Sequence, residues 1–121
     1  MLMRIDCART LITTGFALAV LTAAARPTAA QDDAKIKQGE KVYTAQKCQV
    51  CHQIAGKGGK ASPLDGVGGK LSAEDIRQWI THPKEMADKA KSTKKPPMQD
   101  KYGSLSAGDL DNLVAYVQSL K

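Results

Sequence analysis

The pentapeptide CQVCH, from Cys48 to His52, restricts the fold and chemistry of this chain more than any other segment. Two thiols three residues apart are able to hold zinc, exchange a disulfide or attach a cofactor. A structural zinc site needs four ligands, and beyond these three residues the chain after residue 30 offers only the distant His82. A dithiol oxidoreductase is expected to carry Cys-x-x-Cys near a βαβ pattern, and no such pattern is visible. Both interpretations remain as weaker alternatives.

A histidine directly after the second cysteine favours covalent attachment of haem c. The two thiols add to the two vinyl groups on one porphyrin edge, so the next residue is held beneath the ring, where its imidazole reaches the iron. Cys48 and Cys51 are therefore predicted to bind the porphyrin, and His52 is predicted to ligate the iron. One covalent haem c per chain is the predicted cofactor.

The first thirty residues have the pattern of an export signal. Arg4 and Arg9 precede the apolar run LITTGFALAVLTAAA, and small residues follow it up to Ala30. We expect cleavage after Ala30, which makes residues 1–30 a signal peptide and residues 31–121 a single domain. The run is short and interrupted by threonine, so an uncleaved membrane anchor remains only as a weaker alternative. After cleavage no stable membrane insertion is expected. The mature chain is predicted to be soluble and periplasmic, or otherwise exported.

The predicted domain is too small to rely on a large hydrophobic core. Residues 31–121 contain few large aromatic side chains, namely Tyr43, Trp79, Tyr102 and Tyr116. Small exported domains usually gain stability from disulfides, metals or other bound groups. A large apolar cofactor would complete such a core, which supports the haem interpretation.

The charge of this domain is mildly basic, with 15 Lys and Arg against 11 Asp and Glu in residues 31–121. The lysines are not interleaved with aromatic residues, so nucleic acid is not an expected partner. Basic residues gather between positions 84 and 101, on both sides of Met98: Lys84, Lys89, Lys91, Lys94, Lys95 and Lys101. This cluster predicts a redox partner that is acidic at its docking face, because opposite charges steer association.

Apolar spacing and end signals predict helices over residues 32–47, 71–83 and 106–121. Gly39 lies inside the first helix, where glycine costs about 1 kcal/mol relative to alanine, so a close approach by the last helix is expected. Pro83 ends the second helix or begins a new turn, a further short helix can follow it, and two prolines make residues 91–100 a loop. No strand-like alternation is present. The predicted fold class is all-α, with three to four helices wrapped around one haem.

Taken together, the motifs resemble a class I c-type cytochrome, a small exported mono-haem cytochrome c, over nearly all of residues 32–121. The segment GEKVY is similar to the family's first helix, and LVAYVQSL is similar to its last helix, with Leu113 and Tyr116 in the packing positions. The segment SPLDGVG is similar to the loop in which a carbonyl near Pro63 accepts the Nδ1 proton of the haem histidine. The segment PPM is similar to the loop that supplies a methionine to the iron.

The resemblance implies that His52 and Met98 are the two axial ligands. It also places an aromatic residue, here Trp79, beside the methionine or the haem, with Tyr102 as a second residue of this kind. The stretch between residues 83 and 98 is longer than in the best-known members of the family, so Met86 and His82 remain alternative ligands.

The function implied is one-electron transfer between periplasmic or membrane-bound redox partners, without enzymatic activity. Two filled axial positions leave no open site for a substrate, and an enclosed His/Met haem favours a high reduction potential. The alternative is a haem enzyme subunit or a gas-binding sensor, in which the sixth ligand is labile.

Overall fold

The computed structural model describes residues 29–121, so the predicted signal peptide lies outside the described residues except for its last two positions. The described part contains five α-helices: α1 (Ala29–Ala45), α2 (Val67–Lys70), α3 (Ala73–Thr81), α4 (Pro83–Lys89) and α5 (Ala107–Gln118). It also contains two 3₁₀ helices, η1 (Cys48–Val50) and η2 (Asp100–Ser104), and a hairpin of β1 (Gln53–Ile54) and β2 (Lys57–Gly58). The all-α prediction is confirmed. Beyond the three helices predicted from periodicity, α4 is the further short helix that can follow Pro83, and the one-turn helix α2 was not predicted.

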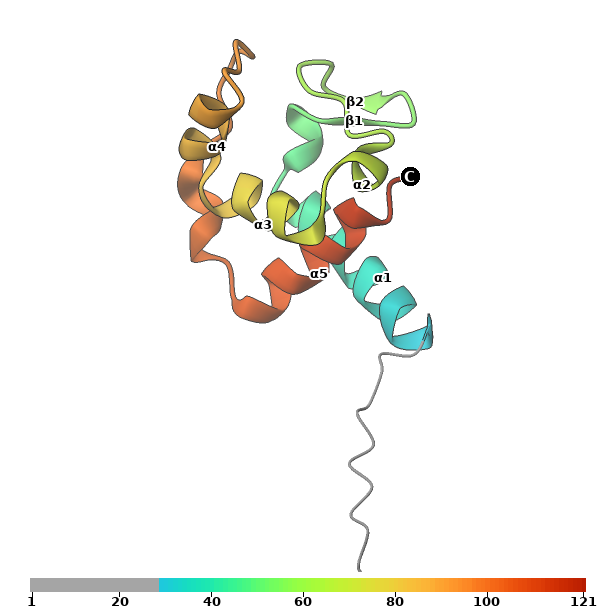
Figure 1. The fold of residues 1–121 in the computed structure, drawn as a ribbon. Coiled ribbons are helices and arrows are strands. Elements are labelled where there is room, and N and C mark those ends of the chain that lie inside the picture. The colour runs from blue at the N-terminus through green and yellow to red at the C-terminus, as the bar shows by residue number, and fades with distance from the viewer. Residues whose placement is uncertain (1–28) are drawn as a thin grey trace, which may run out of the picture.

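The helices α1 and α5 cross at the position expected from the sequence (Figure 1). A Cβ atom added to Gly39 would overlap the carbonyl oxygen of Asn112 and would lie 2.6 Å from the Cβ of Tyr116. The rings of Tyr43 and Tyr116 pack next to this point, with centroids 5.4 Å apart. The helices approach this closely because residue 39 has no side chain, so the predicted close approach is confirmed.

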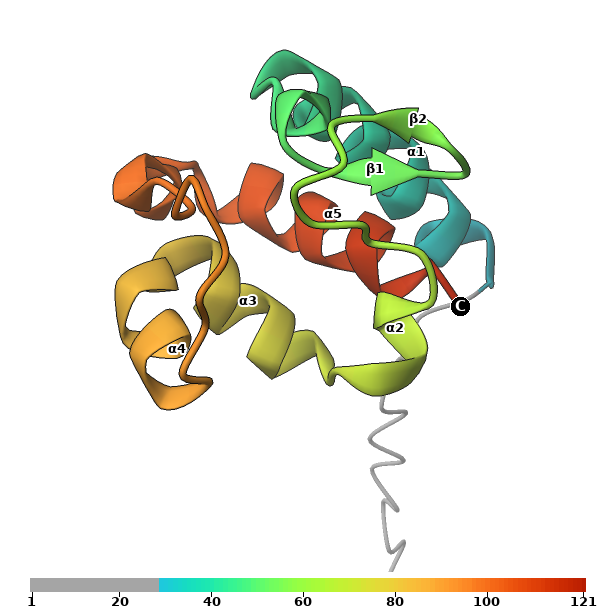
Figure 2. The same cartoon turned by 90° about the horizontal axis from the view of Figure 1, so that it is seen from above.

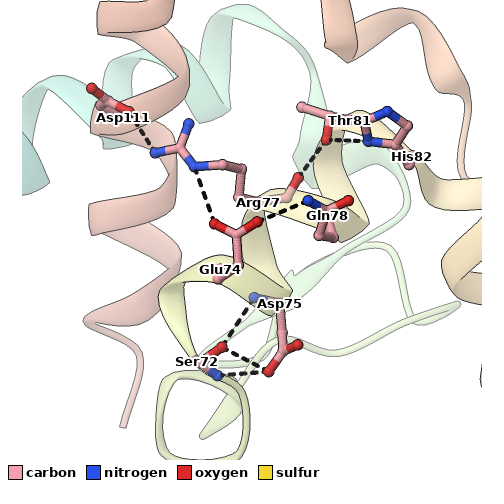
Figure 3. Close-up of polar contacts among 8 residues, drawn as sticks. All are labelled: Ser72, Glu74, Asp75, Arg77, Gln78, Thr81, His82 and Asp111. Atoms are coloured by element: carbon pink, nitrogen blue, oxygen red, sulfur yellow. Dashed lines mark hydrogen bonds and ion pairs between the residues drawn. The ribbon is translucent and has the colours of Figure 1, made fainter.

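The helix α3 begins with a capping box formed by Ser72 and Asp75 (Figure 3). The Ser72 side-chain oxygen accepts a hydrogen bond from the Asp75 N–H at 3.0 Å, and the Ser72 N–H donates to the Asp75 carboxylate at 3.3 Å. These bonds satisfy backbone donors that the first helical turn leaves free. The ion pair between Arg77 and Asp111 then ties α3 to α5.

Pro83 begins α4, because proline is well suited to the first turn of a helix, where its missing N–H is not needed. The following segment to Gln99 contains no helix, as expected from Pro96 and Pro97. Figure 2 shows α5 in the middle of the fold, with α1 and the hairpin on one side and α3 with α4 on the other. Between residues 29 and 121 no helix is long and apolar enough to cross a membrane.

The small hairpin was not predicted, because two-residue strands are too short to show alternation. Ala55 and Gly56 connect the strands with φ values of 49° and 78°, which is the backbone geometry of a two-residue type I′ turn. The Ala55 N–H donates to Asp65 Oδ1 at 2.8 Å. This bond fastens the hairpin to the loop between β2 and α2, in which Asp65 lies.

Candidate cofactor site

A cavity of about 200 Å³, partly open to solvent, lies between α3, α5 and the CQVCH segment. Most of its lining is apolar and comes from α1, the CQVCH segment, α2, α3, α5 and the loops around Pro63 and Met98: Tyr43, Cys48, His52, Ser62, Pro63, Leu64, Val67, Leu71, Ile76, Trp79, Ile80, Met98, Tyr102, Leu113 and Val117. Several of these side chains also belong to the buried core, so the cavity borders the hydrophobic interior directly. A large apolar group in this place would complete the core.

The CQVCH segment folds as a tight turn directly after α1. Lys47 adopts a left-handed conformation, with φ 56°, and reverses the chain into η1. The N–H groups of Cys51 and His52 then both donate to the Cys48 carbonyl, at 3.2 and 3.0 Å. Cys48 lines the cavity, whereas Cys51 is exposed and is not part of the lining, and both thiols are free.

The Cys48 thiol is partly buried, and burial raises its pKa, because a thiolate is poorly solvated there. The nearby ammonium of Lys101 acts in the opposite direction but is the smaller influence. Burial likewise raises the pKa of Tyr43 to about 12, and it raises the pKa of Tyr102. Both phenols therefore stay protonated and neutral at neutral pH.

Hydrogen bonds from its backbone N–H and from its ring hold His52 in place. Its Nδ1 lies 2.8 Å from the carbonyl oxygen of Ser62. A carbonyl only accepts, so Nδ1 carries the proton and Nε2 keeps a free lone pair, as a metal-binding histidine requires. The resemblance pointed to a carbonyl near Pro63. The acceptor is the residue before it, and Pro63 itself lines the cavity.

Of the three candidate sixth ligands, only Met98 lines the cavity. Its side chain is partly buried and packs against the core cluster. His82 is exposed, and its Nδ1 is hydrogen-bonded to the Thr81 hydroxyl at 2.8 Å (Figure 3). Met86 lies on α4 outside the lining. The arrangement therefore favours Met98 over the other two, and it also brings Trp79 into the same cavity.

Sequence reasoning missed three apolar residues that form one wall of the cavity, namely Leu64, Val67 and Leu71. Their spacing of three and four residues is helical, but the helix α2 has only one turn. Its position depends on Gly68, where a Cβ would overlap the Gln118 carbonyl oxygen at the end of α5. The only signal for this wall in the sequence was a few apolar residues at helical spacing next to glycines.

The residues present fit a covalently attached haem better than a zinc ion. Residues 29–121 contain no group of three or more His, Cys, Asp or Glu side chains placed to hold a metal ion. The cavity instead offers apolar walls, one thiol at the edge, an imidazole with a free Nε2 and a thioether. Imidazole and thioether are the axial pair typical of c-type haem iron.

Comparison with known proteins identifies the family. A family model described as cytochrome c matches residues 36–121. Subunit 2 of cytochrome c oxidase from Alkalihalophilus pseudofirmus is 29% identical over 93 residues, which cover 69% of this chain and 25% of that protein. The chain thus spans about a quarter of that relative's length, and no solved structure matches it. The chain belongs to the cytochrome c family, whose cofactor is covalently bound haem c with its iron.

Proposed function

We propose that this chain is a mono-haem one-electron carrier in which His52 and Met98 fill both axial positions of the iron. The observation that supports this most strongly is that one apolar cavity contains both the His52 imidazole, with its proton on Nδ1, and the Met98 side chain. Haem c supplies an iron that exchanges one electron between its ferrous and ferric states. An electron carrier needs no further reactive group from the protein.

Each remaining site residue has a simple task in this proposal. Cys48 and Cys51 hold the porphyrin edge, and the Ser62 carbonyl keeps the His52 proton on Nδ1. The apolar walls exclude water, and Trp79 contributes a large side chain to them, together with Ile76 and Ile80. Exclusion of water and a methionine ligand both favour a high reduction potential.

We further propose that the mature chain works outside the cytoplasm, after removal of residues 1–30, and that its partners are acidic redox proteins. The lysines that precede Met98 are all exposed: Lys84, Lys89, Lys91, Lys94 and Lys95. The similarity to an oxidase subunit makes a membrane-bound oxidase a suitable electron acceptor. Charge steering gives fast encounter and a small interface allows quick release, as a carrier requires.

Reversing the charge of two lysines tests the partner proposal. In the double variant Lys94→Glu, Lys95→Glu, we expect the bimolecular electron-transfer rate with an acidic redox protein to fall about 10-fold or more at low ionic strength. The rate should also depend less on salt. Stopped-flow kinetics across a salt series measures both effects.

The matched control carries the same charge change on α1, in the variant Lys35→Glu, Lys37→Glu, where both lysines are exposed. This control should keep most of the rate and the salt dependence. An equal loss in both double variants would show that net charge, and not the cluster, sets the rate.

A second candidate function is gas binding or catalysis at a labile sixth position. The observation in its favour is that Met98 follows seven consecutive exposed residues, from Lys91 to Pro97. Carbon monoxide added to the ferrous protein separates the two functions. A carrier in which Met98 stays bound should show no rapid change of the haem spectrum, whereas rapid and complete carbon monoxide binding would establish a sensor-like or enzyme-like site.

A further inference from the structure

The candidate iron ligand His52 is anchored at three of its atoms. Its N–H donates to the Cys48 carbonyl at 3.0 Å, and its ring Nδ1 donates to the Ser62 carbonyl at 2.8 Å. Its own carbonyl oxygen accepts a hydrogen bond from the Tyr43 hydroxyl at 3.3 Å. The first two contacts come from the CQVCH turn and the loop after it. The third comes from α1 and therefore connects the ligand to a different part of the fold.

The crossing of α1 and α5 determines where the Tyr43 hydroxyl lies. Tyr43 is 6% exposed, and its ring packs against Tyr116 of α5 at a centroid distance of 5.4 Å. Tyr116 in turn lies over Gly39, where the two helices approach each other closely. A tyrosine enclosed in this way loses little further freedom when it donates its hydrogen bond, so the donor is preorganised.

Space around the acceptor is also restricted. A Cβ at Gly58 would overlap the His52 carbonyl oxygen, so the hairpin backbone lies directly against this carbonyl. With β2 on one side and the Tyr43 hydroxyl as a donor, the peptide plane after His52 has little room to rotate.

We propose that Tyr43 is a positioning residue for His52, and that its hydroxyl ties the carbonyl of the axial histidine to the α1–α5 crossing. This inference rests on the proposed function, because it takes His52 as the iron ligand. The bonds to Ser62 and Tyr43 act on different parts of His52. The Ser62 carbonyl fixes the rotation of the imidazole ring, and the Tyr43 hydroxyl fixes the backbone that carries the ring. Phenylalanine at position 43 would keep the packing on Tyr116 and lose only the hydrogen bond.

The test compares Tyr43→Phe with Tyr116→Phe, which removes the other hydroxyl of the same aromatic pair. Haem-loaded protein is labelled with ¹³C at the histidine carbonyls, reduced to its diamagnetic ferrous form and examined by NMR. His82→Gln assigns the second of the two histidine signals. We expect an upfield shift of the His52 carbonyl signal in Tyr43→Phe, because a carbonyl carbon loses deshielding with its hydrogen bond. In the ferric form, the His52 ring signals should move as well.

The Tyr116→Phe variant should leave both sets of His52 signals in place. In the wild-type protein, the Tyr43 hydroxyl proton should be protected from exchange and should show a nuclear Overhauser contact to His52, a result that needs no variant.

An unmoved His52 carbonyl signal in Tyr43→Phe, or an equal shift in Tyr116→Phe, would overturn the inference while the carrier function stands. A lower urea midpoint with unmoved His52 signals would give Tyr43 a purely structural role and would overturn it too. A wild-type spectrum without histidine-ligated haem would instead overturn the proposed function, and the inference with it.

Discussion

Replacing Gly39 with alanine is expected to lower the free energy of unfolding by about 3 kcal/mol, because the added Cβ would overlap the Asn112 carbonyl oxygen. The obstacle is backbone, which cannot rotate away as a side chain can, so α1 and α5 must move apart. Separation would also loosen the packing of Tyr43 on Tyr116. Urea unfolding of the haem-loaded protein, followed by circular dichroism, measures the loss.

The matched control is Gly108→Ala, at a helical glycine in α5 whose added Cβ would meet nothing within 4 Å. There we expect unchanged stability or a gain of up to about 1 kcal/mol, because alanine favours the helix. Gly39→Ala unfolding at the wild-type urea concentration would refute the importance of the close helix crossing.

The second large effect concerns Met98. In Met98→Ala we expect the haem to remain attached through the cysteines, while the sixth position opens and the reduction potential falls. Axial ligands set haem potentials over a range of about 0.8 V, so the loss of the thioether should be evident in a redox titration. The weak long-wavelength absorption band of ferric iron bound to methionine sulfur should disappear.

Met86→Ala is the control, since Met86 lies on α4 outside the cavity lining. It should keep both the sulfur band and the wild-type potential. If Met98→Ala retained both properties, and a variant at Met86 or His82 lost them, the sixth ligand would have to be reassigned.

The parts of the fold that sequence predicted best are those with several signals in agreement. For α3 and α5, apolar periodicity and a serine cap indicate the same start, and the structure has Ser72 and Ser106 as the capping residues. Gly39 also carried information, because a glycine inside a helix is costly unless another chain segment needs the space. The helix crossing was therefore predictable from one residue.

The missed elements are short and depend on contacts made far along the chain. The helix α2 has one turn and is placed by Gly68 against the end of α5. Gln118 strengthens this contact, since its side-chain amide donates to the Gly68 and Leu71 carbonyls at 2.7 and 3.1 Å. Local sequence patterns do not reveal contacts between residues so far apart in the chain. The predicted cleavage after Ala30 falls within α1, which begins at Ala29, and it remains a prediction.

The candidate site was predictable where a residue acts through its side chain. The structure brings Cys48, His52, Trp79 and Met98 to one cavity, while their roles toward the haem remain predictions. The Ser62 carbonyl could only be placed near Pro63, because any residue type supplies a carbonyl and the fold alone decides which one reaches Nδ1. For the same reason, the hydrogen bond from the Tyr43 hydroxyl to the His52 carbonyl could not be predicted from the sequence.

The optical spectrum of the exported protein, produced with haem maturation machinery and recorded in both oxidation states, tests the central claim most directly. The account predicts the reduced bands of haem c together with the sulfur band in the ferric form. Haem bands without the sulfur band would contradict ligation by Met98. A colourless protein would contradict the attachment of haem at Cys48 and Cys51 and the proposed function as a whole.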